Sequence, residues 1–282
     1  MDKRKLEEAF FKGLMIASTF IVVGSLLAVI TIVVLKGAPA LSLSMLTQTP
    51  KGGYYLGKGG GILNAIVGSL YLAGGATALA FVISLPVALY LQEYAGRSKL
   101  ASFTRLSLDV LWGVPSIVYG AFGFTIMLYL GMRASLLWGI IVVALLVLPI
   151  MTRAMDEVVR MVSLELREAS YALGATKLET VLKVVSRQAL PGILTAVLLA
   201  FGRGIGDAAS VLLVAGYTDY IPHSLFDPVA TLPLAIFFQL GTPFPKVQQR
   251  AYASAVILLG VVLLLSLASR LLTKKFTRYV IK

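Results

Sequence analysis

The sequence predicts an all-α membrane protein with six transmembrane helices and with both termini in the cytoplasm. The 282 residues are 58% hydrophobic and only 13% charged, whereas a soluble domain carries about 25% charged residues. Six segments are apolar over the length of about 20 residues that crosses a bilayer. In the connections between them and the two terminal segments, 17 Lys and Arg lie on one side and 6 on the other. We expect the more basic side to be cytoplasmic.

The predicted spans cover about residues 13–35, 62–91, 107–130, 134–152, 192–216 and 251–272. The first is longer than the apolar core of a signal peptide, about 7–15 residues, so we expect it to be retained. Pro115 lies within the third span and predicts either a helix kink or a gating hinge. We divide the chain into a first helix with its outer loop (1–60), one transmembrane domain (61–275) with a cytoplasmic connection at 153–190, and a tail (276–282).

Two outer connections are long. Residues 36–61 are rich in Gly, Ser, Thr and Pro and predict an irregular loop. Residues 217–250 contain five prolines around an apolar stretch, Leu232–Leu240, which is too short to cross a bilayer. It predicts a short helix at the outer mouth. We expect His223 to be solvated in this connection, and Asp219 and Asp227 to be turn residues.

The stretch 167–192 is a polar segment between two apolar ones, and its charges exclude it from hydrocarbon. Gly174 interrupts the helical pattern and permits a turn. Pro191 is expected at the entry to the fifth span, where a helix tolerates proline. The pattern predicts a short amphipathic helix, a turn and a second short helix. The segment is either a surface hairpin between two spans or a surface that binds a partner. Four residues at helical spacing can form one apolar stripe: Leu164, Tyr171, Leu178 and Leu182.

Arg203 and Asp207 fall inside the fifth span, and Asp207 is essentially the only acid within a predicted span. A mid-membrane charge is costly and indicates a functional site by default. On a continuous helix the two side chains would share one face. They are either a neutralising pair that specifies packing or an oxyanion site, because a guanidinium offers a planar fork of donors. Asp207 would accept a hydrogen bond from a protonated oxyanion, which favours phosphate over sulfate.

Several function classes lack the residues that they need. One histidine and no cysteine argue against a metal site. The phosphate-binding pattern G-x-x-x-x-G-K-[ST] does not occur in the sequence. We therefore expect no catalysis, no ATP hydrolysis and no bound cofactor in this chain. The net charge of +12 follows from the basic connections rather than from a nucleic-acid partner.

The polar segment resembles the motif E-A-A-x3-G-x9-I-x-L-P of permease subunits of bacterial ATP-binding-cassette (ABC) importers. Glu168, Ala169 and Gly174 match the motif, and Ser170 replaces its second alanine. Val184 stands at the isoleucine position, whereas the Leu-Pro pair occurs four residues late. In that family the segment docks on an ATPase subunit. The resemblance therefore implies a coupling role for Glu168, Ala169, Ser170 and Gly174.

Further stretches resemble the permeases of phosphate importers, most closely the PstA type, over about residues 60–280: Asn64–Ser69, Trp112–Gly120, Arg203–Asp207 and Thr231–Phe237. Family members usually carry glutamate at the position of Asp207. The resemblance implies a type I ABC importer transmembrane domain in the bacterial plasma (inner) membrane, with Arg203 and Asp207 on the substrate path.

The implied partners are a homologous second permease (PstC-like), two ATPase subunits (PstB-like) that use ATP and Mg, and an extracytoplasmic phosphate-binding protein. Two alternatives stay open. One is an ABC permease for another oxyanion or small solute, since the coupling motif is shared among cargoes. The other is a self-sufficient anion channel or carrier, whose flux ATPase subunits would not change.

Overall fold

The computed structural model describes residues 3–52, 59–96 and 98–277, and over these residues the regular structure is helical apart from one isolated bridge between Pro50 and Gly60. Five helices are long and apolar enough to cross a membrane, or six if the bent pair α4 and α5 is one span. The long helices are α1 (Lys3–Gly37), α3 (Leu63–Glu93), α6 (Leu136–Arg160), α9 (Ser186–Ile205) and α11 (Pro245–Thr277). The shorter ones are α2 (Leu43–Thr47), α4 (Lys99–Gly113), α5 (Ser116–Tyr129), α7 (Leu164–Ala172), α8 (Lys177–Glu179) and α10 (Leu232–Leu240).

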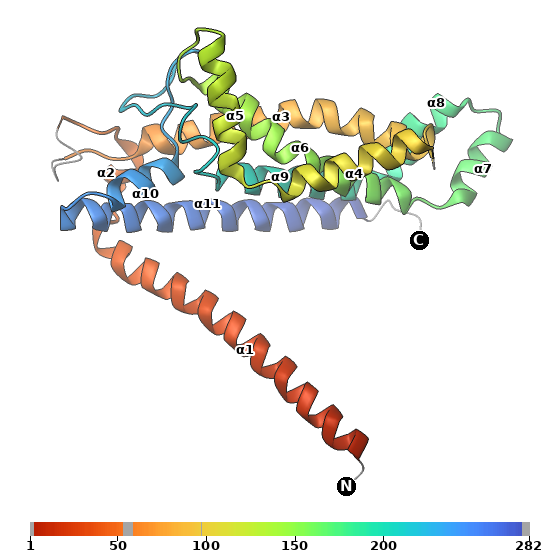
Figure 1. Cartoon of the computed structure of the whole chain (residues 1–282), viewed down its shortest axis with the longest axis horizontal. Coiled ribbons are helices and arrows are strands. Elements are labelled where there is room, and N and C mark those ends of the chain that lie inside the picture. The colour runs from red at the N-terminus through yellow and green to blue at the C-terminus, as the bar shows by residue number, and fades with distance from the viewer. Residues whose placement is uncertain (1–2, 53–58, 97, 278–282) are drawn as a thin grey trace.

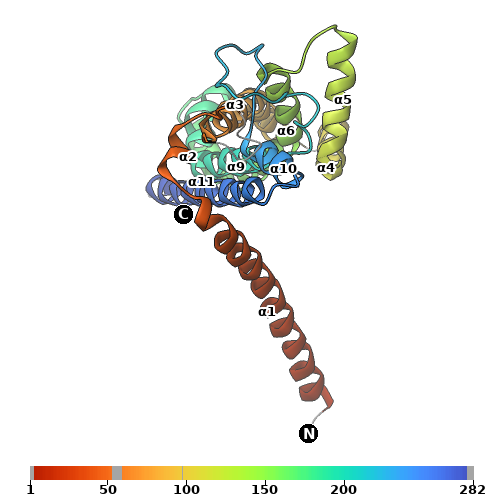
Figure 2. The same ribbon diagram turned by 90° about the vertical axis from the view of Figure 1, so that its left-hand side faces the viewer.

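Helices α3, α6 and α9 form the core, and α11 runs along one side of it (Figures 1 and 2). Ala73, Ala76 and Ala80 on α3 are fully buried. Such small residues let neighbouring helices approach closely where the surroundings are lipid. Larger side chains on α6, including Val147 and Met151, fill the space between them. The core therefore holds the ends of α3, α6 and α9 in fixed relative positions.

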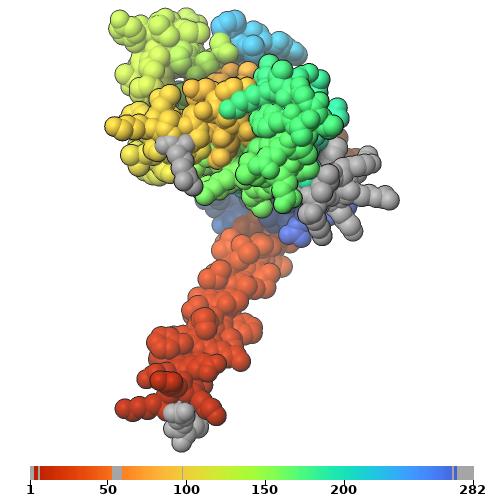
Figure 3. All heavy atoms as spheres, turned by 90° about the vertical axis from the view of Figure 1, so that its right-hand side faces the viewer, coloured from red at the N-terminus to blue at the C-terminus, as the bar shows by residue number. Residues whose placement is uncertain are grey.

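Helix α1 diverges from this body, as Figures 1 and 3 show. The apolar stretch of α1 is not buried by the rest of the chain. The helix meets the body at its outer end, where Lys36 Nζ lies 5.1 Å from the centre of the Tyr252 ring on α11. The prediction of a first helix is confirmed, and the helix extends beyond the expected 13–35 at both ends.

The third predicted span is not one helix. It begins at Lys99 and breaks between Gly113 and Ser116, where α4 and α5 meet at 99°. Pro115 disfavours helical backbone at Val114, and both residues are extended. The Tyr119 hydroxyl donates across the bend to the Leu111 carbonyl (2.8 Å). The expected kink at Pro115 is therefore confirmed, as a full break, and the continuous span 107–130 is corrected.

The fifth predicted span is also corrected at both ends. An uninterrupted helical stretch runs over Lys177–Ile205, with a π-helical turn at Thr180–Val185. Pro191 therefore lies inside α9 and not at its entry. The helix ends at Ile205 with Gly206 as its cap, so residues 206–216 continue without regular helix.

The second outer connection agrees with the sequence, whereas the first, 36–61, is not wholly irregular, because it contains a 3-10 helix at Ala38–Ala40 and α2. Helix α10 has the predicted bounds Leu232–Leu240, and Thr231 Oγ1 accepts a hydrogen bond from its first turn. The Leu232 N–H donates to Ser69 Oγ of α3 (2.7 Å), which fixes α10 against the core. Asp227 is the predicted turn residue, since its carboxylate accepts from the backbone N–H groups of His223 (3.0 Å) and Ser224 (2.9 Å). The His223 residue is exposed, as expected.

Candidate functional site

The polar segment folds as a helical hairpin, which we call the polar hairpin (residues 164–185). Gly174 has a φ of +82°, a left-handed conformation that glycine adopts without a steric penalty. Thr176 then starts the second helix with a capping box, in which Thr176 Oγ1 accepts from the Glu179 N–H and the Glu179 side chain accepts from the Thr176 N–H. The buried hydroxyls of Ser170 and Thr180 lie 2.9 Å apart and join the two arms. The predicted first helix and turn are confirmed, whereas the second helix is not short, because it continues without a break into α9.

Arg167 attaches the polar hairpin to the membrane body. Its Nη2 lies 2.8 Å from Glu93 Oε1 at the end of α3, and Arg167 also donates to the carbonyls of Val159 (3.1 Å) and Val162 at the end of α6. The two ionic side chains are largely buried, 14% exposed for Arg167 and 5% for Glu93. The spacing of Glu93 and Arg97 by four residues predicts a pair at this helix end, but Arg97 lies outside the described residues. The hairpin is thus fixed to the ends of two core helices.

The outer face of the polar hairpin is apolar and exposed. Glu168, Ala169 and Gly174 are also exposed, whereas Ser170 is buried between the two arms. An exposed apolar surface on a short polar element is typical of a partner-binding site. The exposed apolar side chains are Leu173 and the four of the predicted stripe: Leu164, Tyr171, Leu178 and Leu182.

Arg203 lies in the last turn of α9, deep within the body. The neighbouring Gly204 packs on Val143 and Val147, well inside α6. Arg203 is exposed, and it forms no hydrogen bond or ion pair with the part of the chain that the structure describes. An exposed charge at this depth does not face hydrocarbon. That Arg203 lines a water-filled path or meets another chain stays a prediction.

The expected side-by-side arrangement of Arg203 and Asp207 is wrong. Side chains four residues apart share a face only on a continuous helix, and α9 ends between them. The Asp207 carboxylate instead holds the following turn. Its Oδ2 accepts from the Ser210 N–H (2.8 Å) and the Ser210 hydroxyl (2.5 Å).

The segment 206–216 completes the crossing without regular helix. Its far end pairs with the start of α6, where the Ser135 N–H donates to the Val214 carbonyl (2.9 Å). Its middle lies on α5, since a Cβ at Gly120 would be 2.7 Å from the Ser210 carbonyl oxygen. Irregular backbone at membrane depth is stable only within protein or beside a water-filled cavity. Arg203 therefore stands where the span unwinds, beside the carbonyl end of α9.

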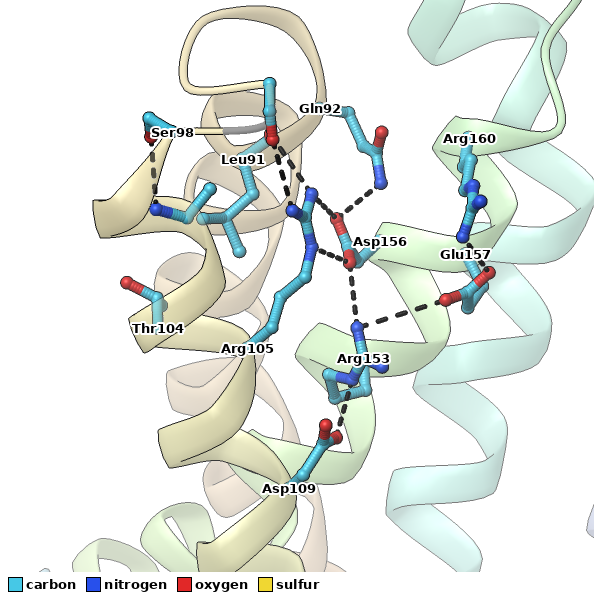
Figure 4. Close-up of polar contacts among 12 residues, drawn as sticks. Leu91, Gln92, Ser98, Thr104, Arg105, Asp109, Arg153, Asp156, Glu157 and Arg160 are labelled. Atoms are coloured by element: carbon cyan, nitrogen blue, oxygen red, sulfur yellow. Dashed lines mark hydrogen bonds and ion pairs between the residues drawn. The ribbon is translucent and has the colours of Figure 1, made fainter.

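The sequence interpretation missed a second charged centre, shown in Figure 4. Asp156 on α6 is fully buried and is paired with Arg105 of α4 (2.9 Å) and Arg153 (3.0 Å). Arg153 also pairs with Asp109 of α4 (2.7 Å). The prediction had placed 153–160 in a connection, so Asp156 was not counted among membrane acids. The available signal was the spacing of Arg153 and Asp156 by three residues at the end of an apolar run.

Residues 80–280 match the family model described as "Binding-protein-dependent transport system inner membrane component". The chain is 33% identical to the phosphate transport system permease protein PstA of Haemophilus influenzae, over 95% of this chain and 94% of that protein. It is 38% identical to PstA 1 of Mycobacterium tuberculosis, over 78% and 72%.

Among solved structures, the chain resembles an inward-facing MetNI methionine ABC transporter chain (TM-score 0.63, 21% identity, 76% of this chain and 95% of that chain). It also resembles a chain of a bacterial alginate ABC transporter (TM-score 0.67, 12% identity, 99% of each). These likenesses concern the fold. With the family match and the PstA relatives, they show that the chain belongs to the binding-protein-dependent transport permeases, the non-catalytic membrane subunits of ABC transporters.

Proposed function

We propose that this chain is the PstA-type permease subunit of an ATP-driven phosphate importer in the bacterial plasma membrane. The observation that supports phosphate as the cargo is Arg203. Its guanidinium is exposed, lies deep in the body and has no partner among the described residues. A guanidinium binds phosphate oxygens with paired donors. Relatives named as phosphate permeases, aligned along nearly the whole chain, support the same cargo.

The complex that we propose contains a PstC-like second permease, two PstB-like ATPase subunits that use ATP and Mg, and an extracytoplasmic phosphate-binding protein. The exposed face of the polar hairpin, with Glu168, Ala169 and Gly174, is the surface for an ATPase subunit. Ser170 has a different role in this proposal. It is buried against Thr180, so it maintains the shape of the hairpin rather than contacting the partner.

Asp207 would select the protonated form of the oxyanion. In the described part of the chain, its carboxylate accepts both of its hydrogen bonds on Oδ2. Oδ1 would accept from the remaining proton of phosphate, which sulfate lacks near neutral pH. Uptake by Asp207→Asn with phosphate and sulfate in competition tests this role. We expect more competition by sulfate, and unchanged selectivity would contradict it.

The whole proposal is tested by purifying the chain with its partners and measuring phosphate uptake into vesicles. We expect uptake to require the ATPase subunits, ATP and the binding protein. Uptake that persists without ATPase subunits would indicate the channel or carrier. ATP-dependent uptake of another oxyanion, with phosphate excluded, would indicate a different cargo. An Arg203→Gln complex that retains full uptake would remove Arg203 from the path.

A further inference from the structure

The carboxylate of Asp156 connects three helices at one buried point. Its side chain is 0% exposed. Oδ1 accepts from Gln92 Nε2 of α3 (2.8 Å) and from Arg105 Nη2 of α4 (3.2 Å). Oδ2 accepts from Arg105 Nε (2.9 Å) and from Arg153 Nη1 of α6 (3.0 Å). As Figure 4 shows, the donors surround the carboxylate from several sides.

Arg105 extends the same connection to the end of α3. It donates to the carbonyls of Leu91 and Gly96, both at 3.2 Å. Helix α4 is also attached by Ala101 and Leu108, which are buried in one cluster with Leu91 of α3, and by the ion pair of Asp109 with Arg153 (2.7 Å). Most of its large side chains are exposed: Leu100, Phe103, Leu106, Val110, Leu111 and Trp112. We call the contacts of Asp156 with Gln92, Arg105 and Arg153 the Asp156 cluster; its carboxylate is a fully buried polar attachment of α4.

Separating α4 from α6 would leave a buried carboxylate without its bidentate partner. Breaking a buried ion pair on one side is strongly unfavourable, because the remaining charge is neither solvated nor paired. Arg105 also satisfies two backbone carbonyls, which would lose their donors at the same time. The contact between α4 and α6 is therefore expected to persist while other parts of the molecule move.

Fixed contacts lead from the polar hairpin to the cluster. Arg167 joins the hairpin to the ends of α3 and α6, and Asp156 joins α6 to α4. After α4 comes the 99° bend at Val114 and Pro115, and beyond it α5 packs on the irregular segment 206–216 through Gly120. The bend, which the hydrogen bond from the Tyr119 hydroxyl to the Leu111 carbonyl spans, is thus the first place along this route where no buried ion pair of the described residues fixes the angle between two helices.

We infer that Asp156 is a positioning residue. It fixes α4 to α3 and α6, so that movement of the polar hairpin is taken up at the bend between α4 and α5, beside the segment that follows Arg203. The inference rests on the proposed function, because it concerns how ATPase subunits drive the substrate path. Asp156 contacts no substrate in this role.

The first test compares Asp156→Asn with Glu157→Gln in the reconstituted complex. Glu157 is the neighbouring acid on α6, is 53% exposed, and forms only long ion pairs of 3.8 and 3.9 Å. The measured quantity is phosphate transported per ATP hydrolysed. We expect Asp156→Asn to lower this ratio about tenfold, as for residues that carry coupling between sites, while Glu157→Gln leaves it unchanged. Equal ratios in the two variants would overturn the inference.

A variant that does not assemble is replaced by Arg105→Lys, which keeps the charge but not the paired donors and is expected to lower the same ratio. Failure of the proposed function gives a different result, since the unmodified complex would then show no ATP-dependent phosphate uptake. A normal unmodified complex with normal ratios in Asp156→Asn and Arg105→Lys would overturn the positioning role alone.

The second test needs no change in the cluster. The sequence contains no cysteine. Two cysteines can therefore be introduced at chosen exposed residues, and each can carry one spin label. Labels at Phe103 of α4 and Arg160 of α6 should keep one distance with and without ATP. Labels at Phe103 and Phe122 of α5 should change their distance. A change in the first pair, or none in the second, would overturn the inference.

Discussion

Two arginines of this chain, Arg105 and Arg203, have opposite surroundings. Arg105 on α4 donates four hydrogen bonds, two to Asp156 and two to carbonyls at the end of α3. Arg203 on α9 is exposed and forms no hydrogen bond or ion pair within the described ranges. Both side chains carry the same charge, so their difference comes from the neighbours that the fold brings to them.

The comparison distinguishes two roles of a guanidinium group. That of Arg105 stabilises the fold, whereas that of Arg203 is available to bind a substrate. A guanidinium with four of its five N–H donors engaged has little to offer to a substrate. Its removal leaves the buried Asp156 with Arg153 as its remaining cationic partner. A guanidinium without a partner among the described residues contributes little to folding, and its donors remain available. Arg105 is therefore expected to act on stability, and Arg203 on transport.

The largest effect should come from Arg105→Met. Asp156 would remain buried with one fewer cationic partner, and the free energy of unfolding should fall by about 3–5 kcal/mol. Denaturant-induced unfolding in detergent measures it. The double variant Arg105→Met/Asp156→Leu is the control and should recover most of the loss, because it removes both buried partners. A single variant as stable as the unmodified protein would contradict the assignment of Arg105 to structure.

Arg203→Gln should leave the free energy of unfolding unchanged and reduce phosphate uptake about 100-fold, which corresponds to about 2.7 kcal/mol. Arg203→Lys should retain part of the uptake, since it keeps the charge but not the planar fork. The measurement is initial uptake rate in vesicles at matched complex content. If Arg203→Gln instead unfolds the protein, Arg203 has a structural role like that of Arg105, and the proposed difference between the two residues is wrong.

Gly174→Ala should have an intermediate effect. A Cβ at Gly174 would meet no atom within 4 Å, so the cost comes from its left-handed backbone alone, about 1–2 kcal/mol. We expect affinity for the ATPase subunits to fall about tenfold, as measured by binding to the purified permease. Gly202→Ala is the matched control, because its Cβ also meets nothing but its backbone is helical. Equal affinities for the two variants would show that the hairpin turn does not contribute to binding of the ATPase subunits.

The smallest effect should come from Glu157→Gln. Its ion pairs to Arg153 and Arg160 are long and exposed, so the free energy of unfolding should change by less than about 0.5 kcal/mol. The same unfolding measurement checks this value against Arg105→Met. A loss comparable with that variant would show that proximity to Asp156, rather than burial, determines the cost.

Some elements were predictable from the sequence because local chemistry defines them. Leu232–Leu240 became α10 with its predicted bounds, since Thr231 caps it, and Gly174 became the hairpin turn. The two broken spans were not predictable in this way. Hydropathy stays high through Val114 and through Val211–Val214 whether or not the backbone is helical, and a span is inferred from hydropathy alone.

Composition, hydropathy and short motifs were enough to assign the membrane class and the family, because they depend only on residue identity and order. The orientation that the basic residues indicate stays a prediction. Tertiary structure alone decided which charges are paired. Asp156 is buried because α3, α4 and α6 converge on it, and Arg203 is separated from Asp207 because α9 ends at Ile205. Both outcomes depend on contacts between residues far apart in the chain, whose burial and backbone geometry no local pattern specifies.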